Sequence, residues 1–462
     1  MKPIRLEQAA ILAEGMLLAG RPAAEVASVH FDTRQLAAGS LFVALTGGAR
    51  DGHDFLLQAA ESGAVGAIIS EQDKIPEGLP EEFALILVND TLRAFQKLAA
   101  GYRKSFAIPH IAITGSIGKT TTKDIVAHVL ESRYPLLKTY KNYNNHIGVP
   151  LTLLQLEPDH QAAVLELGMN HAGEIDLLAS LVQPEISVIT YIGESHIEYF
   201  GTREKIALAK AELLPHTAPD GLVLLNGDSS YLRQIAHLYA GEIMYYSVAG
   251  KADAGIWAED IRFMEDGMQF DVCFASGERF SAFLPLYGEH NVLNALPAVA
   301  IGKRLGMSHE EIARALATVR LSAMRFEQVH SAHGALYISD AYNASPPSMQ
   351  AAIGTFAELF PERKKVLVLA DMFELGAESK ELHAQVGAYA DQLRDRFELL
   401  VTIGDHTRYL NEAYEGKKIH FANKQDVLPT LLALRDAQHA FLFKASRGNE
   451  LWTVIDDLEN CD

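Results

Sequence analysis

A glycine-rich loop in this chain has the residue types and the spacing of a phosphate-binding loop. It spans residues 114–122, Thr-Gly-Ser-Ile-Gly-Lys-Thr-Thr-Thr, between a run typical of a strand and a run typical of a helix. Gly115 and Gly118 let backbone N–H groups face phosphate oxygens at the start of a helix. Lys119 adds a positive charge, and Thr120 can reach a magnesium ion. An isoleucine replaces the first glycine of the common GxxxxGK[ST] motif, so we predict a shortened nucleotide-phosphate loop, with a chance glycine turn as the alternative.

Three other polar side chains could belong to such a site, although each also has an ordinary structural interpretation. Glu166 ends an apolar run, where burying an unpaired carboxylate is costly and a divalent cation would offset that cost. Backbone donors or an arginine could hold that carboxylate instead. His196 follows another apolar run, where a structural or exposed histidine is the simpler interpretation by itself. Lys210 lies in a helical run, where a solvated lysine is the ordinary expectation.

A mainly parallel sheet would bring these residues together. From residue 110 onward, strand-like runs alternate with helical runs, which is the pattern of a parallel sheet covered by helices on both faces. Such sheets bind their ligands at the carboxyl ends of the strands. The alternation restarts around residues 325–340, with enough chain left to form another sheet. We therefore predict an α/β fold.

Chain length and boundary residues predict three domains. A chain of 462 residues is too long for one core, since a domain usually has roughly 100–200 residues. Residues 1–107 have the pattern of a small α/β unit that ends in a helical run before Pro109, and proline disfavours helix in the residue before it. The restart of the strand pattern places the next boundary near Leu321. We expect domains over residues 1–107, 108–320 and 321–462.

The composition of the chain excludes several classes of protein. It has 40 basic and 59 acidic residues and a net charge of −19, which repels phosphate backbones, so we expect no nucleic-acid partner. Its apolar stretches are interrupted by charges such as Glu14, so we expect no targeting segment and no membrane insertion. Cys273 and Cys461 are far apart in the sequence, which indicates neither a disulfide framework nor a thiolate metal site. A reducing cytoplasm fits this composition.

Seven ordered motifs resemble those of the Mur ligase family of peptidoglycan synthesis. They are TGSIGKTTT (114–122), NYNNHIGVP (142–150), ELGMNHAGEI (166–175), SHIEYFG (195–201), AKAEL (209–213), YGEHNVLNALPA (287–298) and DAYNASP (340–346). The matches cover essentially the whole chain, and the ordered set is far more specific than any one motif. The resemblance implies a small N-terminal α/β domain for a UDP-muramyl-peptide, a central P-loop-type ATPase domain with a mainly parallel sheet, and a C-terminal Rossmann-like domain for the incoming amine.

The resemblance also implies which residues hold ATP and Mg²⁺. The phosphates would contact the loop residues Gly115, Ser116, Ile117, Gly118, Lys119, Thr120 and Thr121. Thr120 and Glu166 would bind one Mg²⁺. His196 would bind a second one together with Lys210 as an N-carboxylated lysine, because a carbamate supplies the oxygen ligand that a hard cation prefers.

Four more positions match residues of the family's nucleotide site. His290 and Asn291 correspond to positions beside the adenine, Asp340 to a position at the ribose, and Arg325 to a position near the γ-phosphate. In the same motif as Asp340, Asn343 matches a residue at the domain interface. Ser345 replaces the asparagine that is usual in DxYNANP, so no role is assigned to it.

Motifs in the two outer domains resemble substrate-binding segments of the family. Asp32, Thr33 and Arg34 correspond to contacts with uridine diphosphate, although an Asp-Thr-Arg triplet alone would be an ordinary turn. The segment ADMFELG (370–376) with His383 resembles the members that add D-alanyl-D-alanine, and the DNPR motif of the diaminopimelate and lysine ligases is missing. The segment KASRG, with Lys444, Ser446 and Arg447, matches a further family motif, and a basic loop that closes a strand is the alternative.

The resemblance therefore implies a ligase that joins D-alanyl-D-alanine to UDP-N-acetylmuramoyl-tripeptide through an acyl phosphate and releases ADP and phosphate. The expected partners are these two substrates and ATP, and the expected oligomeric state is a monomer. Another Mur ligase or an amide ligase like folylpolyglutamate synthetase is the nearest alternative. A nucleotide-dependent scaffold without ligase activity would need a damaged metal or lysine position, and none is damaged here.

Overall fold

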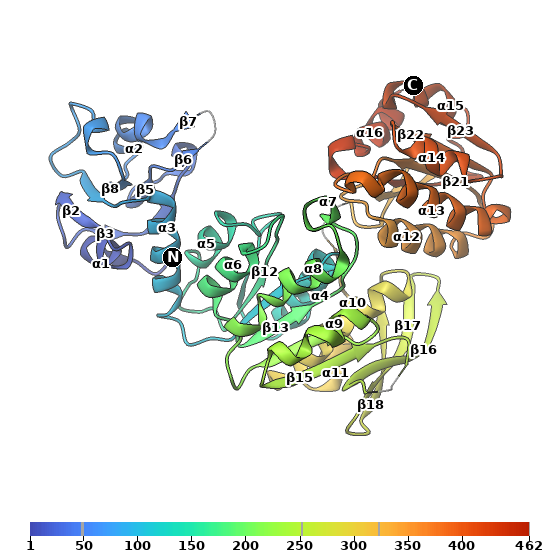
Figure 1. The fold of residues 1–462 in the computed structure, drawn as a ribbon, viewed down its shortest axis with the longest axis horizontal. Helices are drawn as coiled ribbons and strands as arrows, with labels where there is room; N and C mark the ends of the chain where they lie inside the picture. Colours follow the sequence, from blue (N-terminus) through green and yellow to red (C-terminus); the bar gives the residue numbers. More distant parts are fainter. Residues whose placement is uncertain (48–49, 251–252, 322–323, 462) are drawn as a thin grey trace.

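The computed structural model describes residues 1–47, 50–250, 253–321 and 324–461, which form three α/β units in chain order (Figure 1). The N-terminal unit has a five-stranded sheet in the order β2-β9-β8-β5-β4, in which only β2 is antiparallel. Two further pairs, β1 with β3 and β6 with β7, form small two-stranded sheets. The strands of this unit are β1 (Ile4–Arg5), β2 (Met16–Ala19), β3 (Glu25–Val26), β4 (Ser28–His30), β5 (Ser40–Val43), β6 (Thr46–Gly47), β7 (Arg50–Asp51), β8 (Gly66–Ile69) and β9 (Ala84–Leu87). Its helices are α1 (Leu6–Leu12), η1 (Thr33–Gln35), η2 (Gly52–Phe55), α2 (Leu56–Glu61), η3 (Gln72–Lys74) and α3 (Thr91–Arg103).

The central unit contains a nine-stranded sheet in the order β11-β12-β10-β13-β14-β15-β16-β17-β18. Its strands are β10 (His110–Thr114), β11 (Leu136–Lys138), β12 (Ala162–Glu166), β13 (Ile186–Ile189), β14 (Leu222–Asn226), β15 (Glu242–Ser247), β16 (Ile256–Met264), β17 (Gly267–Phe274) and β18 (Arg279–Leu284). Its α-helices are α4 (Lys119–Glu131), α5 (Gly148–Leu153), α6 (Glu174–Val182), α7 (Ile197–Phe200), α8 (Arg203–Ala211), α9 (Ser230–Ile235), α10 (Glu289–Arg304) and α11 (His309–Leu316). Short 3₁₀ turns are η4 (Leu214–His216) and η5 (Ala236–Leu238).

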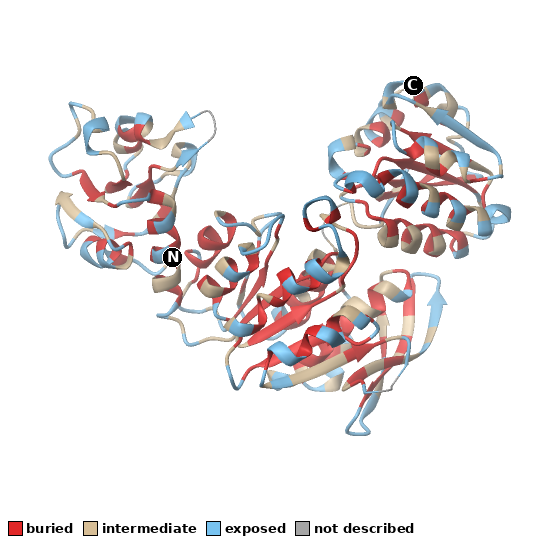
Figure 2. Ribbon diagram, viewed as in Figure 1, coloured by how far each residue is buried: buried red, intermediate tan, exposed pale blue. Residues whose placement is uncertain are grey.

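Helices cover both faces of the parallel part of this sheet, and its inner strands β10, β12, β13 and β14 are buried throughout (Figure 2). Alternate residues of β10 point to opposite faces: Ile111 and Ile113 pack in one core with α4, α10 and α11, whereas Ala112 packs in the other core with α5 and α6. This arrangement confirms the mainly parallel sheet predicted from the alternation of strand-like and helical runs. The antiparallel pairing of β16, β17 and β18, which extends one edge, was not predicted.

The C-terminal unit has a six-stranded sheet in the order β19-β20-β24-β21-β22-β23, parallel except for β19. Its strands are β19 (Glu327–His330), β20 (Leu336–Asp340), β21 (Lys364–Ala370), β22 (Leu399–Ile403), β23 (Lys418–Phe421) and β24 (His439–Lys444). Its α-helices are α12 (Pro346–Glu358), α13 (Ser379–Gln392), α14 (Thr407–Glu412), α15 (Leu428–Leu432) and α16 (Trp452–Asn460). Short 3₁₀ turns are η6 (Gly376–Glu378), η7 (Arg394–Arg396), η8 (Lys424–Val427) and η9 (Arg447–Asn449).

Helix α3 connects the N-terminal unit to the central one. It packs against α1 and β8 on one side and against α5 and α6 on the other. The Tyr102 hydroxyl donates to the carbonyl of Leu156 at 2.7 Å, and the Gln96 amide donates to the carbonyl of His146 at 3.0 Å. Among the described residues, no helix is both long and apolar enough to cross a membrane.

Candidate active site

A cavity of about 620 Å³ lies between the central and C-terminal units, and most of the residues predicted to bind ATP line it. The central unit supplies the loop of residues 116–121 and the ends of its parallel strands. The C-terminal unit supplies the end of β20 and the start of α12. The cavity therefore lies at the carboxyl ends of parallel strands, where α/β sheets bind ligands.

The glycines of the predicted phosphate loop occupy positions that strongly favour glycine. Gly115 follows β10 with φ +152°, and a Cβ there would lie 2.0 Å from the Thr190 hydroxyl oxygen. Gly118 precedes α4 with φ +83°, and a Cβ there would lie 2.6 Å from Asn294 Oδ1. The backbone can thus turn tightly into the N-terminus of a 13-residue helix, where the N–H groups and the helix dipole favour a phosphate.

Lys119 lies at the first position of α4, inside this loop. Its ammonium group donates to the carbonyls of Gly115 at 2.6 Å and Ser116 at 3.3 Å. Burial lowers its pKa, the charge of Glu166 raises it, and the charge of Arg325 lowers it. The three charged groups therefore act on one another within the same cavity, which all three line.

Glu166, the last residue of β12, has the contacts expected of a cation ligand. Its side chain is buried, and Asn144 Nδ2 donates to Oε1 at 2.8 Å. Its other oxygen, Oε2, is buried and accepts no hydrogen bond from any described residue. An unpaired buried carboxylate oxygen is costly, and a hard cation such as Mg²⁺ would offset this cost. The donor set here therefore fits a magnesium ion.

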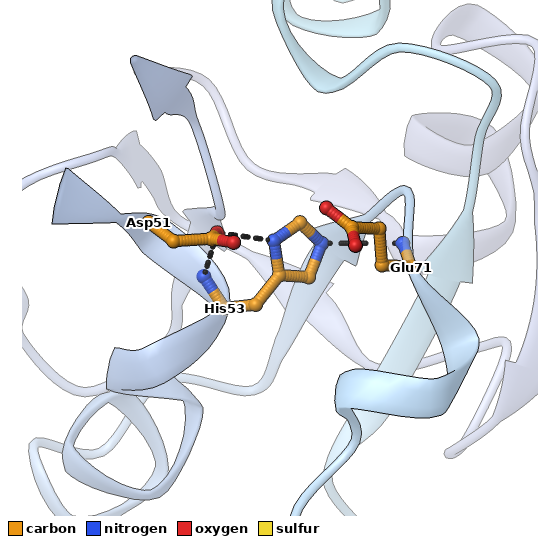
Figure 3. A group of neighbouring side chains, drawn as sticks. All are labelled: Asp51, His53 and Glu71. Carbon is orange, nitrogen blue, oxygen red and sulfur yellow. Dashed lines mark hydrogen bonds and ion pairs between the residues drawn. The ribbon is translucent and has the colours of Figure 1, made fainter. Parts of the chain in front are cut away.

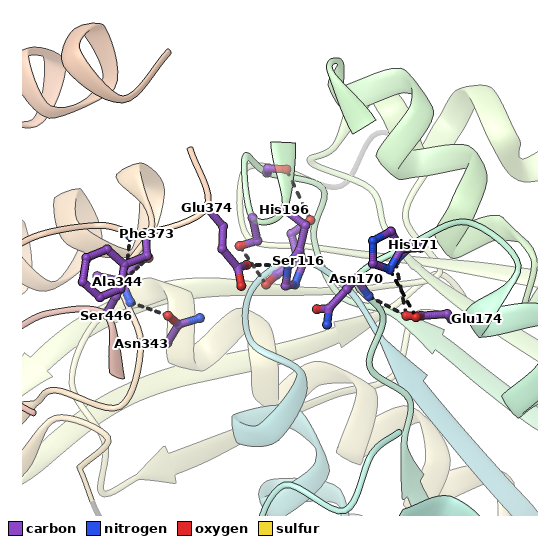
Figure 4. A network of polar contacts seen from close by, with 12 residues as sticks. Ser116, Asn170, His171, Glu174, His196, Asn343, Ala344, Phe373, Glu374 and Ser446 are labelled. Atoms are coloured by element: carbon purple, nitrogen blue, oxygen red, sulfur yellow. Dashed lines mark hydrogen bonds and ion pairs between the residues drawn. The ribbon is translucent and has the colours of Figure 1, made fainter. Parts of the chain in front are cut away.

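His196 lies on the cavity wall directly before α7. It has a left-handed backbone, with φ 67°, and its Nδ1 lies 2.6 Å from Oε2 of Glu374, which belongs to the C-terminal unit. Figure 4 shows these two side chains facing each other between the units. The arrangement leaves Nε2 of His196 free of this contact.

Lys210, on α8, does not line the cavity, and its side chain is almost completely buried. Burial lowers its pKa well below the ordinary value, and the nearby charge of Lys119 lowers it further, while Glu212 has the opposite effect. No hydrogen bond or ion pair holds its ammonium group among the residues that the structure describes. Burial therefore disfavours the charged ammonium form at this position.

The residues predicted to contact the nucleoside also line the cavity. Asp340 ends β20 directly opposite Lys444 of β24, whose ammonium donates to Asp340 Oδ2 at 2.6 Å. Burial lowers the pKa of His290 to about 4, so its imidazole is neutral near pH 7. Asn291 is buried, and its amide donates to the carbonyl of Tyr287 at 2.8 Å.

Arg325 reaches the cavity from the segment before the C-terminal unit. Its guanidinium lies 4.1 Å from the ring centroid of Tyr342, and that of Arg447 lies 5.4 Å from the same centroid. Such contacts between a cation and an aromatic face are favourable. Tyr342 thus holds Arg325 at the cavity wall.

Three residues of the C-terminal motifs have structural contacts, and of these only Ser345 also lines the cavity. Ser345 is the N-cap residue of α12, and its backbone N–H donates to the Ser348 hydroxyl at 2.9 Å. The Ser345 and Ser348 side chains form a capping box, so the serine that stands in place of the usual asparagine has a helix-capping role. His383 is fully buried, and its Nε2 accepts from the Met372 N–H at 3.0 Å. The Ser446 hydroxyl accepts from the Phe373 N–H at 2.9 Å.

The triplet at residues 32–34 lies on the N-terminal unit and does not line the cavity. Asp32 caps η1 by accepting from the Arg34 N–H at 3.0 Å, and it also forms an ion pair with the Arg34 guanidinium at 2.7 Å. Thr33 begins η1. The local structure is thus a capped turn, and a contact with uridine diphosphate stays a prediction.

A cluster of Asp51, His53 and Glu71 in the N-terminal unit has the composition of a metal site but not the free ligand atoms (Figure 3). Both ring nitrogens of His53 are engaged: Nδ1 lies 2.7 Å from Asp51 Oδ1, and Nε2 accepts from the N–H groups of Ser70 and Glu71. The Lys74 ammonium forms ion pairs with both carboxylates, at 2.6 and 2.8 Å. The cluster therefore joins two turns and offers no place for a cation.

Three residues at the site had no role predicted from the sequence. Asn144 holds Glu166, Tyr342 contacts Arg325, and Glu374 contacts His196. All three lie inside motifs that the sequence analysis quoted, which was the only signal that could have found them.

Three family models match the chain in order. They are the Mur ligase family, catalytic domain, over residues 25–103, the Mur ligase middle domain over residues 113–302, and the Mur ligase, glutamate ligase domain over residues 324–447. A UDP-N-acetylmuramoyl-tripeptide–D-alanyl-D-alanine ligase of Bacillus subtilis is 39% identical over 93% of this chain and 92% of its own. The enzyme of that name in Escherichia coli is 34% identical over 94% of this chain and 93% of its own.

Solved structures agree with these relatives. A crystal structure of MurF from Acinetobacter baumannii has a TM-score of 0.90 and 32% identity, with complete coverage of both chains. MurF ligase from Thermotoga maritima, in complex with ADP, has a TM-score of 0.83 and 26% identity over 94% of this chain and 97% of its own. A folylpolyglutamate synthase of Mycobacterium tuberculosis has a TM-score of 0.62 at 16% identity over 80% of this chain and 95% of its own. This likeness shows a shared fold alone.

Proposed function

Since this chain belongs to the Mur ligase family, we propose that it joins D-alanyl-D-alanine to UDP-N-acetylmuramoyl-tripeptide with the consumption of ATP. The observation that carries this proposal is the cavity between the central and C-terminal units, where a phosphate loop, an unpaired carboxylate oxygen and two basic side chains meet. The product is UDP-N-acetylmuramoyl-pentapeptide, a precursor in peptidoglycan synthesis.

We assign one substrate to each of three domains. Residues 1–107 would bind the UDP end of the muramyl peptide through Asp32, Thr33 and Arg34. Residues 108–320 would bind ATP, and residues 321–462 would bind the dipeptide. The separate sheets of the three units support this division, and the position of the cavity allows ATP and the dipeptide to meet.

The reaction needs an activated acid because a peptide carboxylate is a poor electrophile. A carboxylate oxygen attacks the γ-phosphorus of ATP, the bond to ADP breaks, and an acyl phosphate forms. The dipeptide amine then attacks the acyl carbon, and the tetrahedral intermediate expels phosphate as the amide forms and a proton leaves the nitrogen. Lys119 and Arg325 are suited to neutralise the charge on the transferred phosphoryl group.

The nucleotide would lie along the cavity from the loop to the end of β20. The loop residues proposed to contact the phosphates are Gly115, Ser116, Ile117, Gly118, Lys119, Thr120 and Thr121. His290 and Asn291 would lie beside the adenine, and Asp340 would accept a hydrogen bond from the ribose. The neutral imidazole of His290 suits an uncharged base.

Two magnesium sites are proposed, and three of their four residues line the cavity, whereas Lys210 does not. Thr120 and Glu166 would hold one ion, for which the unpaired Oε2 of Glu166 is the supporting observation. His196 and an N-carboxylated Lys210 would hold the other. When bound, the two ions supply positive charge that brings phosphate and carboxylate oxygens together.

Burial of Lys210 supports its carboxylation, since only a neutral amine can attack carbon dioxide. The nitrogen forms a bond to the carbon, loses a proton, and becomes a carbamate whose oxygens carry the negative charge. The buried site then holds an anion that a cation can neutralise.

We propose that the enzyme works in the cytoplasm as a monomer. Both cysteines are free, with Cys273 buried in β17, as expected in a reducing compartment.

A coupling assay with three amines tests the substrate assignment. With ATP and Mg²⁺, the purified chain should convert UDP-N-acetylmuramoyl-tripeptide and D-alanyl-D-alanine to the pentapeptide and release one phosphate, as measured by mass spectrometry and phosphate detection. Two control reactions should give no product: glutamate offered with a folate, and diaminopimelate offered with UDP-N-acetylmuramoyl-dipeptide. The reason is that the segment 370–376 resembles that of D-alanyl-D-alanine ligases. Faster coupling of either control amine would contradict the assignment.

A further inference from the structure

The segment of residues 371–374, which follows β21, is fixed to the C-terminal unit at three successive residues. The carboxylate of Asp371 accepts from three backbone N–H groups at the start of α14, at 2.8 to 3.0 Å. The N–H of Met372 donates to His383, and that of Phe373 donates to Ser446. The position of the next residue, Glu374, is therefore determined by the C-terminal unit.

Glu374 belongs to the C-terminal unit, but its side chain contacts the central unit (Figure 4). Its Oε2 lies 2.6 Å from His196 Nδ1, and its carbonyl accepts from the Glu198 N–H at 3.3 Å. Both Glu374 and His196 have left-handed backbones, with φ 61° and 67°. That conformation is unfavourable for a non-glycine residue, so the surrounding contacts hold both residues in place.

The contact favours one of the two neutral forms of His196. A carboxylate oxygen lies 2.6 Å from Nδ1, although the ring is not turned to the angle of a hydrogen bond. An acceptor this close favours the ring with its proton on Nδ1 and its lone pair on Nε2. His196 lines the cavity, and Nε2 is the atom left to bind a cation there. Carboxylate partners of this kind fix the orientation of metal-binding histidines in many proteins.

We propose that Glu374 is a positioning residue that fixes His196 for a divalent cation, so that the C-terminal unit completes the metal site from across the interface. The inference rests on the proposed role of His196 as a cation ligand. The cation site would then depend on contact between the central unit and the C-terminal unit, which is proposed to bind the dipeptide amine. Loss of docking would weaken the site even when every ligand is intact.

Charge alone offers a simpler explanation, since a carboxylate near the cavity would attract any cation. The two explanations differ for glutamine, which keeps an oxygen that accepts from Nδ1–H but has no charge. Glu374 is 43% exposed, so its replacement is not expected to unfold the chain. Glu378, an exposed carboxylate four residues later, is a matched control.

The test is a titration of the full-length protein with Mn²⁺ in bicarbonate buffer, in which free Mn²⁺ is measured by electron paramagnetic resonance. His196→Ala serves as the reference for loss of this ligand, and thermal unfolding checks that each variant is folded. His196→Ala should abolish one set of Mn²⁺-binding sites. We expect Glu374→Ala to lower the Mn²⁺ affinity of that same set by about 10- to 100-fold. Glu374→Gln should stay near the wild-type affinity, and Glu378→Ala should match the wild type.

Three results would overturn the proposal in different ways. If Glu374→Ala binds Mn²⁺ with wild-type affinity while His196→Ala loses these sites, Glu374 has no positioning role and His196 is still a ligand. An equal loss in Glu374→Gln and Glu374→Ala means that charge alone acts. Unchanged binding in His196→Ala removes the proposed ligand itself, and the positioning role with it.

Discussion

Replacing Lys119 with alanine is expected to lower the rate of phosphate release by about 10³-fold, because the variant loses the cation nearest to the phosphate loop. The position of the ammonium group at the start of α4, 2.6 Å from the Gly115 carbonyl, places it where the terminal phosphates would lie. Its charge would stabilise the transferred phosphoryl group more than the ground state. The measurement is the rate of phosphate release with both peptide substrates present.

Lys138→Ala is the matched control for this variant. Lys138 is a half-exposed lysine on β11 that forms an ion pair with Glu131 at 2.8 Å, and it does not line the cavity. Its replacement should leave the rate within about twofold of the wild type, since exposed ion pairs contribute little. Full turnover in Lys119→Ala, with unfolding temperatures unchanged in both variants, would remove the loop from the mechanism.

Lys210→Ala is expected to lower activity at least about 100-fold, because it removes the carbamate that would bind a cation beside His196. The pKa of Lys210 is lowered by burial, so its amine is available to react with carbon dioxide. Added bicarbonate should not restore the alanine variant, which has no amine. A short carboxylic acid should restore part of the activity by supplying a carboxylate in the space of the missing side chain.

Lys205→Ala provides the control on the same helix. Lys205 is exposed near the start of α8, and its loss should change neither the rate nor the response to a carboxylic acid. Full activity of Lys210→Ala without any added acid would contradict the carboxylation of this residue.

Local sequence was enough to predict the parallel sheets and the phosphate loop. The buried strands of the central unit read as continuous apolar runs, and the loop lies between β10 and α4 as expected. Glycines at 115 and 118 are recognisable because the turn itself requires them. These features depend on neighbours within a few residues, which is why a single sequence reveals them.

Contacts between distant segments could not be predicted in the same way. The antiparallel strands β16 to β18 have exposed and buried residues in an irregular order, so their pairing depends on the edge that β15 offers. The contact between Glu374 and His196 joins two loops from different units, and both residues look like ordinary polar loop positions in sequence. The capping role of Ser345 likewise became clear only with the start of α12 in place.

The transfer of an oxygen atom from the muramyl acid to phosphate tests the acyl phosphate most directly. The tripeptide is prepared with ¹⁸O in its terminal carboxylate, and the phosphate released during ligation is analysed by mass spectrometry. One ¹⁸O atom should appear in each phosphate, because the oxygen that attacked the γ-phosphorus leaves with it. Phosphate that contains no label from the acid would contradict the mechanism.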